Sequence, residues 1–265
     1  MSASGEAAPI LETRGLTRTF GAVFAAKDLN VRIGQGEIVG VIGSNGAGKT
    51  TFINMVTGYL PPSTGDILFD NHSVLGRHPR EITRLGMARS FQVAQLFPKL
   101  TVLENAMVSL VAAEGTQPSF FRPLDTAQRR QRADAIFAEF GVSQYRDALV
   151  STVPQGVRKL VDIAMALVSR PRMLLLDEPT SGVSSEEKFA LMDTVMAVVR
   201  QHGVTVLFVE HDMEIVARYV TRIIAFDSGE IIADGPPASV LGNARVQEFV
   251  VGHQLDANAV AGETA

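Results

Sequence analysis

The sequence predicts an α/β fold with a largely parallel central sheet, and two patterns carry this prediction. Short apolar runs alternate along the chain with longer segments in which apolar residues recur every three or four positions. Three of the runs are continuously apolar, as expected of strands that are buried on both faces, and they span Glu37–Ile42, Arg172–Asp177 and Val204–Val209. The 265 residues suffice for one large domain, or for one domain with a smaller lobe.

Shorter runs with alternating polarity predict an antiparallel β subdomain beside this core. They span Ile10–Leu16, Leu29–Ile33 and Gly65–Asp70, and their alternation is typical of a sheet with one face in water. Near the end of the chain, Arg222–Asp227 and Glu230–Asp234 flank a Ser-Gly dipeptide. We therefore expect a β-hairpin at that point.

Helical periodicity is clearest in four segments, which span Lys49–Val56, Asp125–Phe140, Val157–Leu167 and Glu186–Arg200. The region 86–165 lacks a strong strand pattern, and we expect it to form a helical lobe inserted into the α/β core. The domain as a whole is predicted to span residues 8–252. Residues 253–265 carry few apolar side chains, so we expect a flexible tail there.

The composition removes several classes of function. Twenty-four basic residues against 28 acidic ones give a net charge of −4, which provides no electrostatic reason to expect nucleic acid as a partner. The absence of cysteine excludes disulfides, thiolate metal sites and cysteine nucleophiles. No apolar run approaches the length of a membrane span, and no secretory signal is readable. We therefore expect a cytoplasmic protein that does not cross a membrane.

A glycine-rich segment fits the GxxxxGK[ST] pattern of a phosphate-binding loop. It lies between a predicted buried strand and a predicted helix, which is the context that the motif requires. Backbone N–H groups of such a loop surround a phosphate, while the lysine neutralises phosphate oxygens and the hydroxyl that follows it binds Mg²⁺. The predicted ATP-binding residues here are Gly43, Ser44, Asn45, Gly46, Ala47, Gly48, Lys49, Thr50 and Thr51, with Thr50 as a metal ligand.

Two acids end a second buried run and supply the remaining chemistry. Asp177 is predicted to lie at the carboxyl edge of the parallel sheet, where ligands of α/β proteins bind, and to reach Mg²⁺ through water. Glu178 follows it and points in a different direction. It is predicted to polarise the attacking water, either as a general base or as an anchor.

Together, these residues resemble the ATP-binding subunits of ATP-binding cassette (ABC) transporters, and the resemblance extends from Leu11 to about Val251. It implies the fold of an ABC ATPase. Phe20 falls where an aromatic residue of the family stacks on adenine. Gln92 matches a glutamine that touches Mg²⁺ and the attacking water close to the transporter contact, and His211 matches the histidine that bonds the γ-phosphate.

Two segments depart from the family pattern. The signature usually reads LSGGQ, whereas this chain has Val153-Pro154-Gln155-Gly156-Val157. Because proline is favoured in the first turn of a helix, the N–H groups of Gln155 and Gly156 could still face a phosphate of a second subunit, and we expect function with altered strength. The second departure follows Glu178, where the family usually has a segment that ends in an acid or amide and this chain has Ser181-Gly182-Val183-Ser184.

The resemblance further implies partners. We expect a second ABC ATPase subunit, identical or paralogous, separate membrane permease subunits and an extracytoplasmic substrate-binding protein, with ATP and Mg²⁺ as cofactors. The segments quoted look most like the branched-chain amino acid uptake family. Import of urea, amides or aromatic acids, lipopolysaccharide export, a catalytically weak regulatory cassette and a soluble ABC ATPase without a permease remain alternatives.

Overall fold

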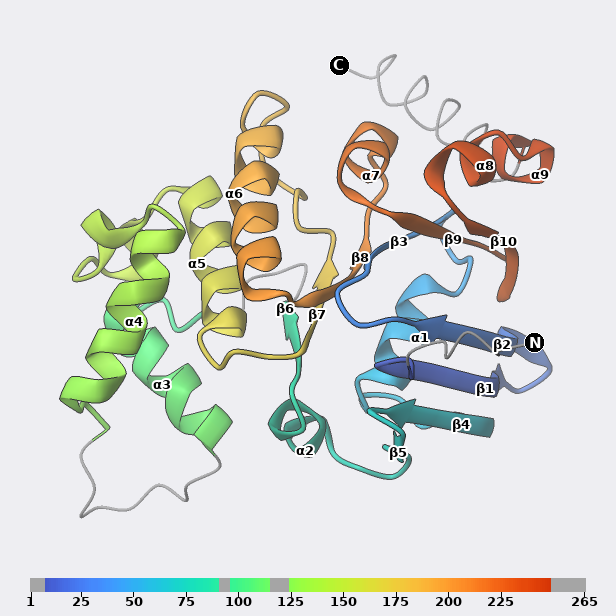
Figure 1. Ribbon diagram of the computed structural model, residues 1–265, viewed down its shortest axis with the longest axis horizontal. Coiled ribbons are helices and arrows are strands. Elements are labelled where there is room, and N and C mark those ends of the chain that lie inside the picture. The colour runs from blue at the N-terminus through green and yellow to red at the C-terminus, as the bar shows by residue number, and fades with distance from the viewer. Residues whose placement is uncertain (1–7, 91–95, 115–123, 249–265) are drawn as a thin grey trace, which may run out of the picture. The chain divides into compact units, whose positions relative to one another are not determined.

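The computed structural model describes residues 8–90, 96–114 and 124–248 (Figure 1). The chain divides into two compact units. The first unit comprises Met1–Pro79 and Leu207–Ala265, and the second comprises Arg80–Val206. Strand β8 (Thr205–Val209) straddles the division between them.

The first unit contains the expected antiparallel subdomain. Its four strands run in the order β2-β1-β4-β5 and span Val23–Ile33, Leu11–Phe20, Thr64–Phe69 and His72–Ser73. The first two strands are longer than the sequence predicts, because β1 and β2 continue pairing up to the contact of Phe20 with Val23. Alternate residues are buried where the two strands pair regularly, at Leu11 and Thr13 of β1 and at Leu29, Val31 and Ile33 of β2, and the alternation is interrupted where the register shifts after Thr13.

Parallel pairing in the first unit joins β3 (Ile38–Gly43) to β9 (Arg222–Asp227). All six residues of β3 are buried, as expected for a continuously apolar strand. The predicted hairpin is confirmed, since β9 pairs in antiparallel fashion with β10 (Glu230–Gly235). Among its described residues, this unit has the helices α1 (Lys49–Val56), α7 (Met213–Tyr219), α8 (Pro237–Leu241) and α9 (Ala244–Val246).

The second unit combines two parallel strands with a group of helices (Figure 1). Strand β6 (Met87–Ser90) pairs with β7 (Met173–Asp177). The sequence did not predict β6, because it is four residues long and only half apolar. The helices are α2 (Pro79–Arg84), α3 (Val102–Glu114), α4 (Ala127–Glu139), α5 (Gln155–Leu167) and α6 (Glu187–His202), with short 3₁₀ turns η1 (Ser143–Tyr145) and η2 (Val150–Thr152).

Local hydrogen bonds explain where several of these helices begin. At α3, Thr101 Oγ1 accepts from the Glu104 amide and the Glu104 carboxylate accepts from the Thr101 amide, which is a capping box. Thr126 caps α4 by accepting from the Arg129 amide. The α3 helix is as long as α4, whereas the sequence indicated only shorter helices there. The fold class is therefore the predicted one, although the helical content of 86–165 was underestimated.

Each unit has an apolar interior. Phe52 and Phe226 pack together in the first unit, with ring centroids 5.5 Å apart. In the second unit, Phe137 and Phe140 of the α4 segment are buried. Within the described residues, no helix has both the length and the apolar character that crossing a membrane requires.

Candidate functional site

The glycine-rich loop follows β3 directly and ends where α1 begins, as the motif predicts. Gly48 is the residue that precedes α1, and it adopts the left-handed conformation with φ of 103°. A Cβ atom at this position would lie 2.6 Å from the Ala25 carbonyl oxygen, so only glycine fits. The Phe52 amide donates to the Gly48 carbonyl at 2.9 Å, which closes the first turn of α1.

The side chain of Lys49 folds back onto the loop that precedes it. Its side chain donates from Nζ to the carbonyl oxygens of Gly43, at 2.6 Å, and Ser44, at 2.9 Å. The residue is only 6% exposed, so its charge is held at the loop and not in bulk water. The loop combines a buried ammonium group with a helix N-terminus and a closely approaching backbone. These features favour the binding of a polyphosphate. The residues present therefore fit the nucleotide that the motif implies.

Thr50 and Thr51 form the first turn of α1, immediately after Lys49. Thr50 is exposed and Thr51 is half-buried. A hydroxyl at this position suits the predicted contact with Mg²⁺. The two threonines therefore remain the predicted metal and nucleotide contacts of the helix start.

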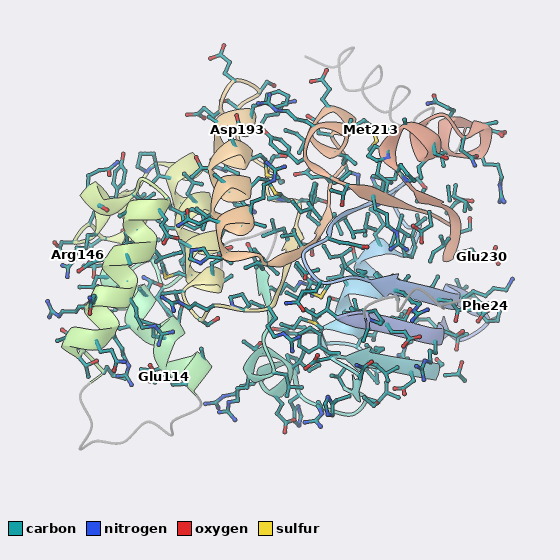
Figure 2. All side chains as sticks on the ribbon, in the orientation of Figure 1. Phe24, Glu114, Arg146, Asp193, Met213 and Glu230 are labelled. Atoms are coloured by element: carbon teal, nitrogen blue, oxygen red, sulfur yellow. The ribbon has the colours of Figure 1, made fainter. Side chains whose placement is uncertain are left out.

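Phe20 lies at the end of β1, in the turn toward β2. Its side chain is 52% exposed, and the Arg18 guanidinium lies 4.7 Å from the centre of its ring. Phe24 on β2 is also exposed, and Figure 2 labels it. An exposed aromatic ring of this kind can stack against a flat ligand. The contact of Phe20 with adenine stays a prediction.

His211 lies in the first unit, between β8 and α7. The Asp212 carboxylate caps α7 by accepting from the amides of Glu214 and Ile215. The cap fixes the backbone at the residue that follows His211. The histidine is half-buried, and its predicted bond to a γ-phosphate stays a prediction.

In the second unit, Asp177 is the last residue of β7, as predicted. Its carboxylate forms an ion pair with Arg89 on β6, at 2.7 Å. Glu178 follows with a positive φ of 47°, a conformation that residues other than glycine seldom adopt. The backbone turns sharply at this point, and the Ser181 amide donates to the Glu178 carbonyl at 3.1 Å. The backbone therefore changes direction immediately after Asp177, and the predicted roles of Asp177 and Glu178 stay predictions.

The signature segment begins α5 two residues earlier than the sequence predicts. Pro154 precedes the helix with extended ψ of 150°, and Gln155 and Gly156 are its first two residues. The Arg158 amide donates to the Pro154 carbonyl at 2.8 Å. Pro154 thus stands at the cap position and not inside the first turn, and proline offers no side-chain acceptor there. The amides of Gln155 and Gly156 belong to the orphan N–H groups of a helix start.

The two departures from the family pattern pack against one another. A Cβ atom at Gly182 would lie 2.6 Å from Gln155 Nε2, so the Gln155 amide fills the space beside that glycine. Gly182 itself has φ of 76°. Ser184 Oγ donates to the Glu187 carboxylate at 2.8 Å and accepts from the Glu187 amide at 3.3 Å. Ser184 therefore stabilises the start of α6, a role that the sequence comparison with the family did not suggest.

The structure distributes the predicted site residues between the two units. The glycine-rich loop, Phe20 and His211 belong to the first unit. Asp177, Glu178 and the Gln155-Gly156 pair belong to the second. Gln92 lies outside the described residues. In the described part of the chain, no cluster of three or more His, Cys, Asp or Glu residues is placed to hold a metal by itself.

Arg89 is the residue that sequence reasoning missed. It lies 88 positions before its partner Asp177, so no local pattern links the two. In the sequence, Arg89 appears as a charged residue in the short segment that precedes Gln92. That signal is weak without knowledge that the segment is a strand.

Comparisons with known proteins show the family to which the chain is similar. A family model described as ABC transporter matches residues 26–181. The high-affinity branched-chain amino acid transport ATP-binding protein BraF of Pseudomonas aeruginosa is 32% identical over 252 residues, which cover 92% of this chain and 98% of that protein. A probable branched-chain amino acid transport ATP-binding protein, LivG of Archaeoglobus fulgidus, is 32% identical over 251 residues, which cover 92% of this chain and 96% of that protein.

Solved structures give the same result. An ATP-binding cassette of an ABC transporter in its ADP conformation superimposes with a TM-score of 0.82 at 29% identity, covering 91% of this chain and 97% of the other. A dimeric ATP-binding cassette in a post-hydrolysis state, bound to ADP and Pi, gives a TM-score of 0.73 at 26% identity. That alignment covers 86% of this chain and 98% of the other.

Proposed function

The chain belongs to the ABC transporter family, and from this premise we propose that it is the ATP-hydrolysing subunit of an uptake system for branched-chain or related amino acids. The observation that carries the choice of cargo is the similarity over nearly the full length of two branched-chain amino acid transport ATP-binding proteins, one bacterial and one archaeal. The subunit would act at the cytoplasmic face of the membrane, with a separate permease and a substrate-binding protein.

Different residues of this chain would bind different parts of the magnesium nucleotide. Lys49, held at the loop by two carbonyls, would neutralise phosphate oxygens, and the α1 helix start would add its N–H groups. Thr50, Asp177 and Gln92 would hold Mg²⁺, and Phe20 would stack on the adenine. The bound nucleotide supplies the free energy of γ-phosphate hydrolysis.

Glu178 would orient the attacking water and accept its proton, and His211 would bond the γ-phosphate. A second copy of the chain, or a paralogue, would present the amides of Gln155 and Gly156 to the same phosphate. The dimeric structure bound to ADP and Pi supports an assembly of this kind. Opening of such a dimer after hydrolysis would move the permease through the region around Gln92.

The test is steady-state ATPase activity of the purified chain with Mg²⁺, beside a Glu178→Gln variant. We expect the variant to bind ATP with wild-type affinity and to lose at least about 100-fold in turnover, because the amide cannot accept the proton. A variant with wild-type turnover would remove Glu178 from this role. An inactive wild type that binds ATP would favour the regulatory cassette, since Pro154 replaces the signature serine.

Cargo needs a separate measurement in cells. Uptake of labelled leucine, isoleucine and valine, and in parallel of labelled urea and a labelled aromatic acid, would be compared between cells that carry the wild-type gene and cells that carry the Glu178→Gln gene. We expect uptake of branched-chain amino acids to depend on Glu178. Dependence of urea uptake alone would contradict the proposed cargo and leave the ATPase role intact.

A further inference from the structure

Strand β6 contributes a nearly buried ion pair to the acidic end of β7. The exposed fractions of the Arg89 and Asp177 side chains are 8% and 13%, and Nη2 of Arg89 lies 2.7 Å from Oδ2 of Asp177. Parallel pairing sets Arg89 beside Leu175, two residues before the end of the strand. The long arginine side chain therefore spans the distance to the carboxylate that β7 presents at its end.

The next residue of β6 points elsewhere. Ser90 Oγ donates to Oδ2 of Asp162 on α5 at 2.6 Å, and both residues are buried. Successive side chains of a strand project to opposite faces of the sheet, so Arg89 and Ser90 serve different partners from adjacent positions. Ser90 therefore offers a matched control that disturbs the same strand without touching Asp177.

The geometry of the pair leaves part of the carboxylate available. Among the described residues, Arg89 is the one group bonded to the Asp177 side chain, and its bond engages Oδ2. The guanidinium is always charged, so its bond to Oδ2 restrains that oxygen and places a positive charge beside the carboxylate. Removing it would leave a poorly solvated carboxylate without its counter-charge.

We propose that Arg89 is a positioning residue for Mg²⁺ binding: by holding one oxygen of Asp177, it keeps the other oriented toward the water shell of the metal. Hydrogen-bonded partners of metal-binding carboxylates set metal affinity in this way, and their loss costs 10–100-fold in affinity in typical sites. The inference rests on the proposed function, because it takes a magnesium nucleotide as the ligand.

A competing effect has the opposite sign. The arginine charge also repels a divalent cation, so its removal would tighten metal binding if repulsion dominated. Two substitutions separate the effects. Arg89→Met removes both the charge and the planar group, whereas Arg89→Lys keeps the charge and loses the planar group.

The experiment measures metal binding without turnover. Mn²⁺ would replace Mg²⁺, and its binding to the full-length protein would be followed by electron paramagnetic resonance in the presence of a non-hydrolysable ATP analogue. For Arg89→Met we expect the Mn²⁺ dissociation constant to rise about tenfold or more. Affinity for the analogue in EDTA should be unchanged. The Ser90→Ala control should lower the melting temperature and leave the Mn²⁺ dissociation constant at its wild-type value.

Several outcomes would overturn the inference. Unchanged or tighter Mn²⁺ binding in Arg89→Met would do so, as would an equal loss of analogue affinity in EDTA, which would indicate a general structural role. If Arg89→Met does not fold, Arg89→Lys decides: a several-fold weaker Mn²⁺ affinity supports the inference, and a wild-type value contradicts it. A wild-type protein that binds no analogue, with or without Mn²⁺, would instead contradict the proposed function.

Discussion

The two units build their parts of the candidate site in different ways. In the first unit, the glycine-rich loop is one continuous stretch, and Lys49 bonds to carbonyls only five and six residues before it. In the second unit, the contacts join distant segments, such as Arg89 with Asp177 across 88 positions. The geometry of a site made of neighbouring residues can be predicted from a local sequence pattern. The geometry of a site made of distant residues forms only when the chain folds.

The largest expected effect comes from breaking the local site. Gly48→Ala would set a Cβ atom 2.6 Å from the Ala25 carbonyl, at a φ of 103° that disfavours any side chain. We expect nucleotide affinity to fall about 100-fold, which corresponds to about 2.7 kcal/mol. Titration with a fluorescent ATP analogue would measure the loss.

Gly76→Ala provides the control for that substitution. Gly76 belongs to the same unit and also has a positive φ, of 71°, but among the described residues no atom lies within 4 Å of the position that its Cβ would occupy. We expect this variant to lose about 1 kcal/mol of stability through backbone strain, with nucleotide affinity unchanged. Equal affinities of the two variants would show that crowding at Gly48 has no bearing on binding.

This contrast explains how much the sequence could predict. The loop, the strand before it and the bounds of α1 follow from one contiguous pattern, and α1 spans Lys49–Val56 as expected. The fold class follows because buried strands and amphipathic helices each carry a periodic signal. For the same reason, the observed bounds of β7 and α5 lie within two residues of the predicted bounds.

Other features carry no local signal. Strand β6 is too short for its periodicity to be read, and its place in the fold is set by pairing with a strand more than eighty residues away. The contact of Gln155 with Gly182 is likewise non-local. Sequence reasoning identified both segments as departures from the family pattern, but only the structure shows that they pack together.

A substitution at Gly182 would test whether those two departures depend on one another. Gly182→Ala introduces a Cβ atom 2.6 Å from Gln155 Nε2, at a φ of 76°. We expect it to lower the free energy of unfolding by about 1–3 kcal/mol, partly through strain and partly by displacing the Gln155 side chain. Urea unfolding of the full-length protein would measure this change.

The double variant Gly182→Ala with Gln155→Ala separates the two causes. Truncating Gln155 removes the crowding and leaves the strain, so we expect the double variant to be more stable than Gly182→Ala alone. Gln155→Ala by itself serves as the reference for the cycle. Strictly additive effects would mean that the two residues do not interact.

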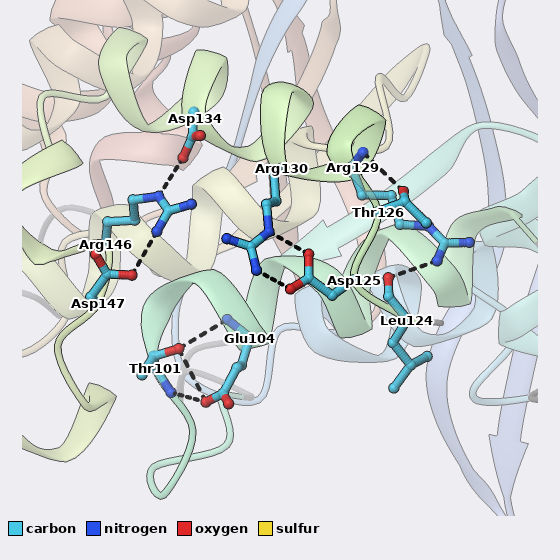
Figure 3. Close-up of polar contacts among 10 residues, drawn as sticks. All are labelled: Thr101, Glu104, Leu124, Asp125, Thr126, Arg129, Arg130, Asp134, Arg146 and Asp147. Carbon is cyan, nitrogen blue, oxygen red and sulfur yellow. Dashed lines mark hydrogen bonds and ion pairs between the residues drawn. The ribbon is translucent and has the colours of Figure 1, made fainter. Parts of the chain in front are cut away.

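The helices of the second unit also carry ion pairs on their surface (Figure 3). Arg146 pairs with Asp134 and Asp147, and Arg130 pairs with Asp125. In the first turn of α4, Arg129 binds Glu114 at the end of α3, at 2.6 Å. The Arg129–Glu114 and Arg146–Asp134 pairs join α4 to α3 and to the residue that follows η1. Each pair is partly open to water, so each contributes little to stability.

The smallest expected effect concerns one of these pairs. The hydrogen bond from Arg129 holds the pKa of Glu114 below its ordinary value, and the charges of Arg129 and Arg132 act in the same direction. A carboxylate with a lowered pKa in the folded state stabilises the fold above its unfolded pKa, and the contribution is lost as pH falls through the folded pKa. Glu114→Gln should therefore cost about 0.5 kcal/mol at pH 7.

The pH dependence separates this pair from a packing effect. The difference between wild type and Glu114→Gln should shrink as the pH falls below about 4.3, because the wild-type carboxyl then becomes neutral as well. Urea unfolding at several pH values would follow it, and high salt should shrink it at pH 7. Glu186→Gln is the matched control, since Glu186 is exposed and forms no ion pair within the described ranges. If the loss in free energy of unfolding caused by Glu114→Gln stays constant from pH 7 into acid, the Glu114 side chain stabilises the fold through packing and not through its charge.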